Sequence, residues 1–244
     1  MEHGRLIGIG NTANVYGYGE GKVLKLFHQG YPVEDVAKEF NNAIAIRDMN
    51  FEKPKAHEVI SFEGENGIIY DRVEGESLLD WTMKTGDVKK CAEYMAKLHR
   101  TIVENKIDNV SNYKDFLRFH ILSASSEDLN KQKDTLQLLD KLPEGDSLCH
   151  GDFHPGNILI SNGNTFVLDF MNICQGDLLY DVARTVFLVE YTPVPEGDYD
   201  REGLLQLKKT LADLYLMEMN VTREMIQDYL LVIIAARKGE CPNE

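Results

Sequence analysis

The sequence predicts an α+β fold of two parts: a small antiparallel β-sheet carrying one helix, followed by a larger, mainly helical part. The first third consists of short apolar or β-branched runs separated by glycines and polar turns, which is typical of hairpin-connected strands. From about residue 77 to 142, and again over the last fifty residues, apolar side chains recur at helical spacing. Residues 72–76 lie between these regions, so we place the boundary between a first domain, 1–73, and a second, 74–244.

The first domain contains five predicted strands and one helix. RLIGIG, NVYGY and KVLKLF are three strands, and the sequence GEG at residues 19–21 predicts a hairpin turn between the last two. PVEDVAKEFNNAIAIRDM has apolar residues at helical spacing behind Pro32, which favours a first turn. AHEVISF and GIIYD are two further strands joined by a polar turn. The helix is therefore expected to lie against a small antiparallel sheet.

The second domain opens with a helix signal and is interrupted once by strands. Ser77 followed by Asp80 resembles a capping pair. DVKKCAEYMAKLHRTIVEN carries one continuous apolar stripe, and YKDFLRFHIL and EDLNKQKDTLQLLDKL are less regular helices. SLCHGDFHPGNILI and NGNTFVLDF interrupt them with two short strands and a loop. The loop is HGDFHPGN, residues 150–157.

Composition narrows the function classes. The chain has 244 residues, 26 basic against 40 acidic, for a formal charge of −14. Such a charge repels nucleic acid and anionic membranes and favours a cationic small substrate. The amino terminus lacks a signal-peptide pattern, and the longest apolar run, LLVIIAA, is too short to span a bilayer. The four cysteines lack CxxC spacing, so we expect reduced thiols, mostly buried, in a cytoplasmic protein.

Two features of the first domain suggest anion binding. The segment from Gly8 to Val15 contains Gly8 and Gly10, whose backbone could approach an anion, although an ordinary glycine-rich hairpin fits equally well. Lys25 interrupts the apolar run VLKLF, so its ammonium either reaches solvent at a sheet edge or points into a cleft to meet phosphate oxygens. Glu39, on the edge of the apolar stripe of the following helix, favours the cleft because its carboxylate could hold the ammonium.

The HGDFHPGN loop and the strand after it carry the candidate catalytic chemistry. Pro155 and Gly156 keep this loop from becoming helix. Asp152 could accept the proton of an attacking hydroxyl, and the amide oxygen of Asn157 could ligate Mg²⁺; the alternative for Asp152 is a turn-capping acid. Asp169, at the end of FVLD, is either a further Mg²⁺ ligand or an ordinary strand-terminal acid.

The two histidines of the loop have different interpretations. His150, before Gly-Asp, is predicted to be a structural hydrogen-bonding residue rather than the base. His154, two residues after Asp152, could sit near a transferred phosphoryl group, which is the weaker of the assignments in this loop.

Together these motifs resemble the aminoglycoside phosphotransferase and choline kinase family, within the protein-kinase-like fold. HGDFHPGNIL resembles the catalytic loop of that family and VLDF its metal-binding strand. GDLLYDVAR, MAKLH and IIYDRVEGESLL resemble its acidic helix start, its leucine-histidine helix end and its interlobe hinge. The resemblance covers nearly the whole chain in order and spacing. It implies a bilobal kinase-like fold, with an N-terminal nucleotide-binding lobe and a C-terminal catalytic and substrate-binding lobe.

The resemblance also implies roles in nucleotide binding. The turn containing Gly8 and Gly10 would cover the phosphates of ATP, Lys25 would contact them, and Glu39 would pair with Lys25. The backbone of Asp71 and Val73 would hold the purine edge. The sequence does not distinguish ATP from GTP.

For catalysis the resemblance implies Asp152 as the base and Asn157 and Asp169 as Mg²⁺ ligands. It implies mostly structural roles for three other residues, which are Asp177, Asp181 and His99. The chain departs from protein kinases in three places: Ala13 replaces the third glycine, Met171 follows Asp169-Phe170, and no APE-type motif is present. These departures favour a small-molecule substrate over a protein.

The sequence thus predicts an enzyme, a Mg²⁺- and ATP-dependent kinase that phosphorylates a hydroxyl of a small molecule. Aminoglycoside-like, choline-like and amino-alcohol-like acceptors all remain open. The segment EYTPVPEGDYDREG, residues 190–203, could line an acidic, aromatic pocket for an amine or be a solvated loop. An atypical protein kinase and a non-catalytic nucleotide-binding module are the alternatives, and the oligomeric state is not indicated.

Overall fold

The computed structural model describes residues 4–62, 64–124, 129–194 and 200–242. The chain divides into two units, the first formed by Met1–Glu76 and Leu159–Asn172 and the second by Ser77–Ile158 and Ile173–Glu244. The sequence places one boundary between residues 73 and 74. In the structure the first crossing follows Glu76, and the chain returns once to the first unit, through Leu159–Asn172.

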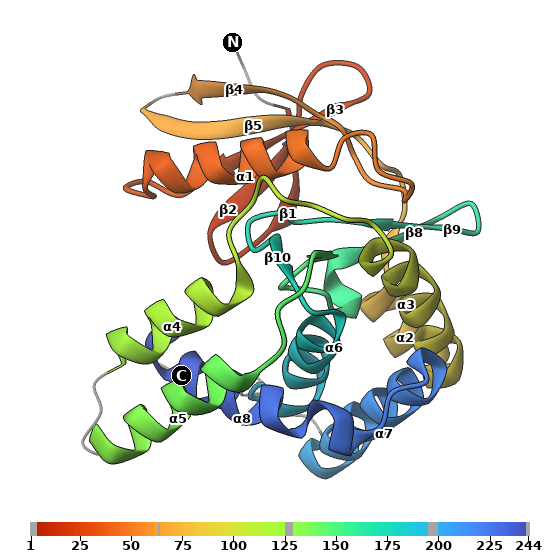
Figure 1. Cartoon of the computed structure of the whole chain (residues 1–244). Helices are drawn as coiled ribbons and strands as arrows, with labels where there is room; N and C mark the ends of the chain where they lie inside the picture. The colour runs from red at the N-terminus through yellow and green to blue at the C-terminus, as the bar shows by residue number, and fades with distance from the viewer. Residues whose placement is uncertain (1–3, 63, 125–128, 195–199, 243–244) are drawn as a thin grey trace. The chain divides into compact units, whose positions relative to one another are not determined.

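Unit 1 is built on a five-stranded antiparallel sheet, drawn in red to orange in Figure 1. In spatial order its strands are β1 (Leu6–Ile9), β2 (Ala13–Gly17), β3 (Lys22–Phe27), β5 (Glu65–Asp71) and β4 (Ala56–Phe62). The predicted GEG turn joins β2 to β3, with Gly19 and Gly21 at φ of 61° and 68°. Leu24, Leu26 and Ile69 pack together as a buried cluster. Because side chains alternate along a strand, Lys25 points away from that cluster.

One helix lies alongside this sheet. Helix α1 (Val33–Ala45) begins after Pro32 and packs on β4 and β5, as Figure 1 shows. Its buried positions include Val36 and Ala43, as the apolar stripe predicts, but also Glu39 and Asn42. Two polar side chains on the buried face of a helix need partners, because an unpaired buried polar group is costly.

The returning segment of unit 1 is a hairpin. Strand β8 (Ile158–Ser161) pairs with β9 (Asn164–Val167) and with the short β6 (Glu76–Ser77). Asn162 and Gly163 occupy the turn with φ of 49° and 82°, which suits Asn and Gly. The Val167 amide donates to the Glu52 carbonyl at 3.1 Å, and this bond ties the end of the hairpin to the earlier part of unit 1.

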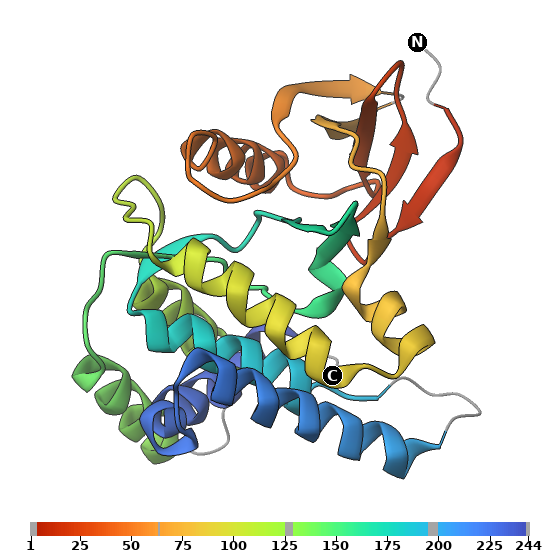
Figure 2. The same ribbon diagram turned by 90° about the vertical axis from the view of Figure 1, so that its right-hand side faces the viewer.

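Unit 2 is mainly helical. Its helices are α2 (Leu78–Thr85), α3 (Val88–Val103), α4 (Tyr113–Ser123), α5 (Leu129–Lys141), α6 (Leu178–Val186), α7 (Arg201–Met219) and α8 (Arg223–Glu240). The capping pair is confirmed at α2, where Ser77 Oγ accepts from the Asp80 amide at 3.0 Å and donates to its carboxylate at 2.8 Å. Figure 2 shows the teal helix α6 among α3, α7 and α8, and its residues from Tyr180 to Val186 are all buried.

Two short strands of unit 2 support the loop that carries the candidate catalytic residues. Strand β7 (Ser147–Cys149) leads into it, and β10 (Cys174–Gly176) pairs antiparallel with β7, so that Cys149 lies opposite Cys174. All four cysteines are free thiols, and all except Cys241 are buried, as expected. None of the helices within the described parts of the chain is long and apolar enough to cross a bilayer.

Candidate active site

The glycine turn of unit 1 is tight only at its second glycine. Gly10 donates to the Ala13 carbonyl at 2.9 Å, closing the connection between β1 and β2. A Cβ on Gly10 would lie 3.0 Å from that same oxygen, whereas a Cβ on Gly8 would make an ordinary contact of 3.7 Å with Val15. An added Cβ would therefore be tightly packed against the backbone at Gly10 and ordinarily packed at Gly8.

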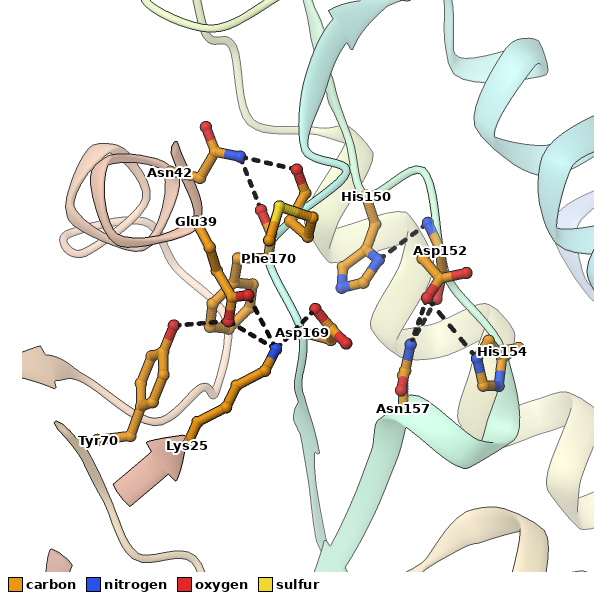
Figure 3. Close-up of polar contacts among 11 residues, drawn as sticks. Lys25, Glu39, Asn42, Tyr70, His150, Asp152, His154, Asn157, Asp169 and Phe170 are labelled. Carbon is orange, nitrogen blue, oxygen red and sulfur yellow. Dashed lines mark hydrogen bonds and ion pairs between the residues drawn. The ribbon is translucent and has the colours of Figure 1, made fainter. Parts of the chain in front are cut away.

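Lys25 lies at the centre of a charged cluster in unit 1. Its ammonium donates to both Glu39 oxygens, at 2.8 and 2.9 Å, and to Asp169 Oδ1 at 3.2 Å (Figure 3). The Lys25 side chain is 14% exposed and that of Glu39 only 1%. The ion pair expected between Lys25 and Glu39 is thus present. Lys25 does not reach solvent at a sheet edge, which was the other alternative.

The charge balance of the cluster keeps Lys25 protonated. Burial alone would lower the pKa of the Lys25 ammonium, but attraction to Asp169 and Glu39 outweighs burial and raises it. The Tyr70 hydroxyl donates to Glu39 Oε1 at 2.9 Å, so the buried carboxylate has a second donor. One ammonium is therefore fixed in position between two carboxylates, with its orientation set from β3, β5 and α1.

The segment around Asp169 is held by its backbone as well as by its charge. The Asn42 side-chain amide of α1 donates to the Phe170 carbonyl at 2.8 Å and to the Met171 carbonyl at 3.2 Å (Figure 3). Asp169 itself adopts a φ of 65°, in the left-handed region that Asp and Asn occupy more readily than most residues. These two bonds give the buried Asn42 side chain, the second polar residue on this face of α1, the partners that it needs. Sequence reasoning missed it; the only signal was an amide within an apolar stripe, three residues after Glu39.

The HGDFHPGN loop of unit 2 is anchored by Asp181 of helix α6. The Asp181 carboxylate accepts from the His150 amide at 2.6 Å and from the Gly151 amide at 2.8 Å, one on each oxygen. His99 Nε2 lies 2.8 Å from Asp181, and His99 Nδ1 lies 2.5 Å from the Tyr215 hydroxyl. Burial works against ionisation of Asp181, but His99, His150 and the Gly151 amide outweigh it and lower its pKa.

A second buried charge on the same helix contacts this loop. Arg184, one turn after Asp181 on α6, donates through Nε to the Gly151 carbonyl at 3.0 Å. Its guanidinium also forms an ion pair with Glu240, the last residue of α8. Asp181 and Arg184 therefore fix both the N–H and the C=O of Gly151. Arg184 ends the motif GDLLYDVAR, but no local pattern in the sequence marks it as part of a site.

Asp152 and Asn157 face each other across the loop. The Asn157 amide nitrogen donates to the Asp152 carbonyl and to Asp152 Oδ2, both at 3.0 Å (Figure 3). The Asp152 side chain is 27% exposed. Because its nitrogen faces Asp152, Asn157 has its amide oxygen directed elsewhere, as an acceptor suited to a hard cation.

The two loop histidines act on the loop backbone. His150 Nδ1 lies 3.3 Å from the Asp152 amide, which fits its predicted structural role. His154 Nδ1 accepts from the Gly156 amide at 3.1 Å and so caps the short 3₁₀ turn Pro155–Asn157. His154 Nε2 lies 3.9 Å from Asp152 Oδ2. The placement of His154 near a transferred phosphoryl group stays a prediction.

The sequence matches the family model of the phosphotransferase enzyme family, APH, over residues 3–214. The chain belongs to that family. This match covers most of its length, and it confirms the resemblance predicted from the sequence. A search of curated proteins finds no match.

Solved structures similar to this phosphotransferase share its fold. One is a thermostable mutant of aminoglycoside phosphotransferase APH(4)-Ia in ternary complex with AMP-PNP and hygromycin B, with 16% identity, a TM-score of 0.69, and coverage of 98% of this chain and 87% of that one. Another is amicoumacin kinase hAmiN with AMP-PNP, Ca²⁺ and Ami, with 16% identity, a TM-score of 0.63, and coverage of 97% and 79%. The predicted kinase-like α+β fold is thereby confirmed.

The phosphotransferase has its candidate residues in two groups. Unit 1 carries the glycine turn, the Lys25–Glu39–Asp169 cluster and the end of β5 at Asp71, with Val73 two residues beyond; unit 2 carries Asp152 and Asn157. Asp177 caps α6 by accepting from the Leu179 amide at 2.8 Å, so it has a structural contact of the expected kind.

The segment expected to line an acidic pocket is only partly described. Glu190 forms an ion pair with Arg223 at 2.7 Å, and Asp200 caps α7 by accepting from the Gly203 amide at 3.0 Å. Glu196, Asp198 and Tyr199 lie outside the described residues. Of the carboxylates in this segment, these two therefore have structural partners within unit 2.

Proposed function

We propose that this phosphotransferase transfers the γ-phosphoryl group of ATP to a hydroxyl of a small molecule, in a Mg²⁺-dependent reaction. The observation that carries the proposal is the Asp152–Asn157 pair in a loop that buried charges hold rigid on both sides of Gly151. Phosphoryl transfer needs mainly positioning and charge neutralisation, so a preorganised loop is the feature such a reaction requires.

Asp152 is the proposed base. Its Oδ2 accepts from Asn157, and among the described residues no donor is bound to Oδ1. A partly exposed carboxylate oxygen of this kind can accept the proton of the attacking hydroxyl and align that hydroxyl with the phosphorus atom. Asn157 keeps the carboxylate in one orientation, so little reorganisation is needed when the acceptor binds.

Lys25 is the proposed contact for the phosphate oxygens of ATP. Its ammonium has three donors and stays charged because Asp169 and Glu39 raise its pKa. Glu39 would hold the ammonium in place after the nucleotide binds, since Tyr70 and Lys25 both fix the carboxylate. The turn containing Gly8 and Gly10 would cover the same phosphates with its backbone amides.

The purine would be read by the backbone after β5. The Asp71 amide already donates to the Lys55 carbonyl at 3.0 Å, so the contact proposed for Asp71 is through its carbonyl. A carbonyl accepts from the amino group of adenine, whereas guanine presents an oxygen at that position. This favours ATP over GTP, with the Val73 backbone as the second contact.

Mg²⁺ is the proposed cation, with Asn157 and Asp169 as its protein ligands. Both supply oxygen, the ligand that Mg²⁺ prefers, and one or two protein ligands suffice when substrate phosphates supply others. Within the described residues no cluster of three or more His, Cys, Asp or Glu side chains could hold a metal alone. When bound, it would offset charge on the phosphates.

The Asp152→Asn variant tests the proposal. We expect turnover to fall by about 10²–10⁴-fold, because the base is lost while the side-chain volume stays the same. The affinity for Mg²⁺·ATP should change little, since Asp152 is not among the proposed nucleotide contacts. Asp228→Asn, an exposed acid on α8, is the matched control.

The assay is Mg²⁺-dependent phosphate transfer to a library of aminoglycosides, choline, ethanolamine, amino alcohols and sugars, with nucleotide affinity measured separately by calorimetry. Full activity of Asp152→Asn would remove Asp152 from its role. Label from ATP appearing in protein instead of a metabolite would favour the atypical protein kinase, and nucleotide binding without turnover on any acceptor would favour the non-catalytic module.

A further inference from the structure

Unit 2 contains a pocket that begins at the HGDFHPGN loop. Its volume is about 330 Å³, and His154 and Pro155 of the loop form part of its wall. Pockets of about 300–1,000 Å³ are typical of small-molecule sites. Leu79 and Met83 of α2 line it as well, and aliphatic side chains of α7 and of the chain before it complete the wall.

The lining of this pocket is apolar, and its few polar groups are occupied. Besides His154, which caps its own turn, the polar lining residues are Thr192 and Lys208. The Lys208 ammonium donates to the Thr192 carbonyl and, at 3.3 Å, to the Thr192 hydroxyl. No carboxylate belongs to the described lining. Glu190, which follows the lining residue Val189, is paired with Arg223.

This chemistry disfavours a polycationic ligand. Among the described lining residues, an ammonium group in the pocket would find no carboxylate to compensate for its lost hydration, and it would share the space with Lys208. The formal charge of −14 acts at long range and favours the approach of cations, but the side chains that contact a ligand decide what is bound. A hydrocarbon body, by contrast, would remove apolar wall from water at no such cost.

The exposure of the two α2 side chains also favours an apolar ligand. Leu79 is 44% exposed and Met83 55%, and both line the pocket. Large apolar side chains gathered at a pocket mouth are typical of a ligand-binding surface, whereas scattered ones are ordinary. Both lie on the helix that the Ser77–Asp80 cap fixes, so the surface is held in place before any ligand arrives.

The pocket also lies next to the proposed base. Asp152 precedes His154 by two residues in the same loop, and Asp152 Oδ2 is 3.9 Å from His154 Nε2. A molecule in the pocket that contacts His154 therefore lies one side chain away from the Asp152 carboxylate. We infer that the pocket binds the hydrocarbon body of the phosphate acceptor, so that the acceptor is a predominantly apolar alcohol rather than a polycationic sugar. This inference rests on the proposed function only because it takes Asp152 as the base that accepts the proton of the acceptor's hydroxyl.

Primary alcohols of increasing length, from butanol to nonanol, test the inference with the whole chain. Binding without nucleotide is followed by the fluorescence of Trp81, the only tryptophan, which lies on α2 with Leu79 and Met83. Transfer is measured in parallel with Mg²⁺·ATP. We expect the Kd and KM to fall about fourfold for each added methylene until the pocket is full, because a buried methylene contributes about that factor. Hygromycin B, the aminoglycoside probe, should not compete.

Met83→Gln is the informative variant, since Gln has similar length and helix propensity but a polar end. We expect it to weaken octanol binding at least fourfold, roughly the effect of one methylene. Met217→Gln is the matched control: Met217 is 61% exposed on α7, outside the pocket lining, and its substitution should leave binding unchanged.

The possible outcomes separate the two proposals. Affinity that does not depend on chain length, equal effects of Met83→Gln and Met217→Gln, or competition by hygromycin B would each overturn the apolar pocket. Transfer to hygromycin B with no binding of the alcohols would overturn it while leaving the phosphotransfer proposal intact. Length-dependent binding without transfer to any acceptor would support the pocket and contradict the proposed reaction.

Discussion

Replacing Asp181 with asparagine removes the charge that anchors the HGDFHPGN loop while keeping the shape of the side chain. In the folded protein each Asp181 oxygen accepts from a backbone amide, His150 on one and Gly151 on the other, and His99 lies 2.8 Å away. Asparagine keeps one acceptor oxygen and puts an NH₂ group where the other oxygen was. One backbone N–H would then face a donor instead of an acceptor.

The expected loss of stability follows from these contacts. A hydrogen bond to a charged group contributes about 1.5–3 kcal/mol, and a buried donor left unsatisfied costs about 1–3 kcal/mol more. We therefore expect Asp181→Asn to lower the free energy of unfolding by about 2.5–6 kcal/mol at neutral pH. It should also lower turnover, because the loop that carries Asp152 loses one of its two anchors at Gly151.

The pH dependence provides a second readout. The folded protein lowers the pKa of Asp181, so its ionisation stabilises the fold at pH values above the unfolded pKa of about 3.9. That contribution is lost as the pH falls through the folded pKa. The stability difference between the original protein and Asp181→Asn should therefore shrink below about pH 4, as the carboxylate is protonated.

Urea denaturation followed by circular dichroism measures both effects. Asp87→Asn is the control, because Asp87 caps α3 by accepting from the Lys90 amide at 2.9 Å, and asparagine is as good a cap. A loss of less than about 1 kcal/mol for Asp181→Asn at neutral pH would refute the reasoning, since it lies below even one lost charged hydrogen bond. A difference that stays constant down to pH 3 would refute the assigned ionisation.

Two further predictions concern unit 1. Tyr70→Phe removes the hydroxyl that donates to the buried Glu39 carboxylate, so thermal or urea unfolding should show a loss of about 1.5–3 kcal/mol; an unchanged midpoint would mean that Lys25 alone satisfies Glu39. Gly10→Ala should weaken nucleotide binding in calorimetry more than Gly8→Ala does, because only at Gly10 would the added Cβ press on a backbone oxygen, at 3.0 Å. Equal affinities for the two variants would contradict the proposed closeness of the turn to phosphate.

Much of the fold could be predicted from local patterns. The alternation in KVLKLF and the helical stripe after Pro32 specify a strand and a helix with Lys25 and Glu39 on faces that can meet, and the structure has their ion pair at 2.8 Å. The Ser77–Asp80 cap, the GEG turn and the apolar stripe of α3 are equally local. Such signals involve residues a few positions apart, so they can be recognised in the sequence without a structure.

The contacts that could not be predicted join distant parts of the chain. Asn42 holds the backbone of Phe170 and Met171, and Arg184 links Gly151 to Glu240. Neither has a periodic or spacing signal, because the partner is a backbone carbonyl or a residue on another helix. The apolar pocket beside His154 is of the same kind: its walls come from separate elements whose proximity only the fold creates. The net charge of the chain favoured a cationic substrate and gave no hint of this lining.

The left-handed backbone conformation of Asp169 restricts which substitutions can be used to test the role of this residue. At a φ of 65°, most side chains would add about 1–2 kcal/mol of backbone strain, whereas asparagine tolerates the conformation as aspartate does. An alanine at this position would therefore mix a conformational penalty with the loss of a ligand, and a drop in activity could not be divided between them. Asparagine removes the charge and replaces one acceptor oxygen with an NH₂ group, but it adds no backbone strain. Asp169→Asn is thus the substitution that tests the carboxylate without a conformational penalty, and the conformation that brings the carboxylate to Lys25 also limits which residue types can replace it without strain.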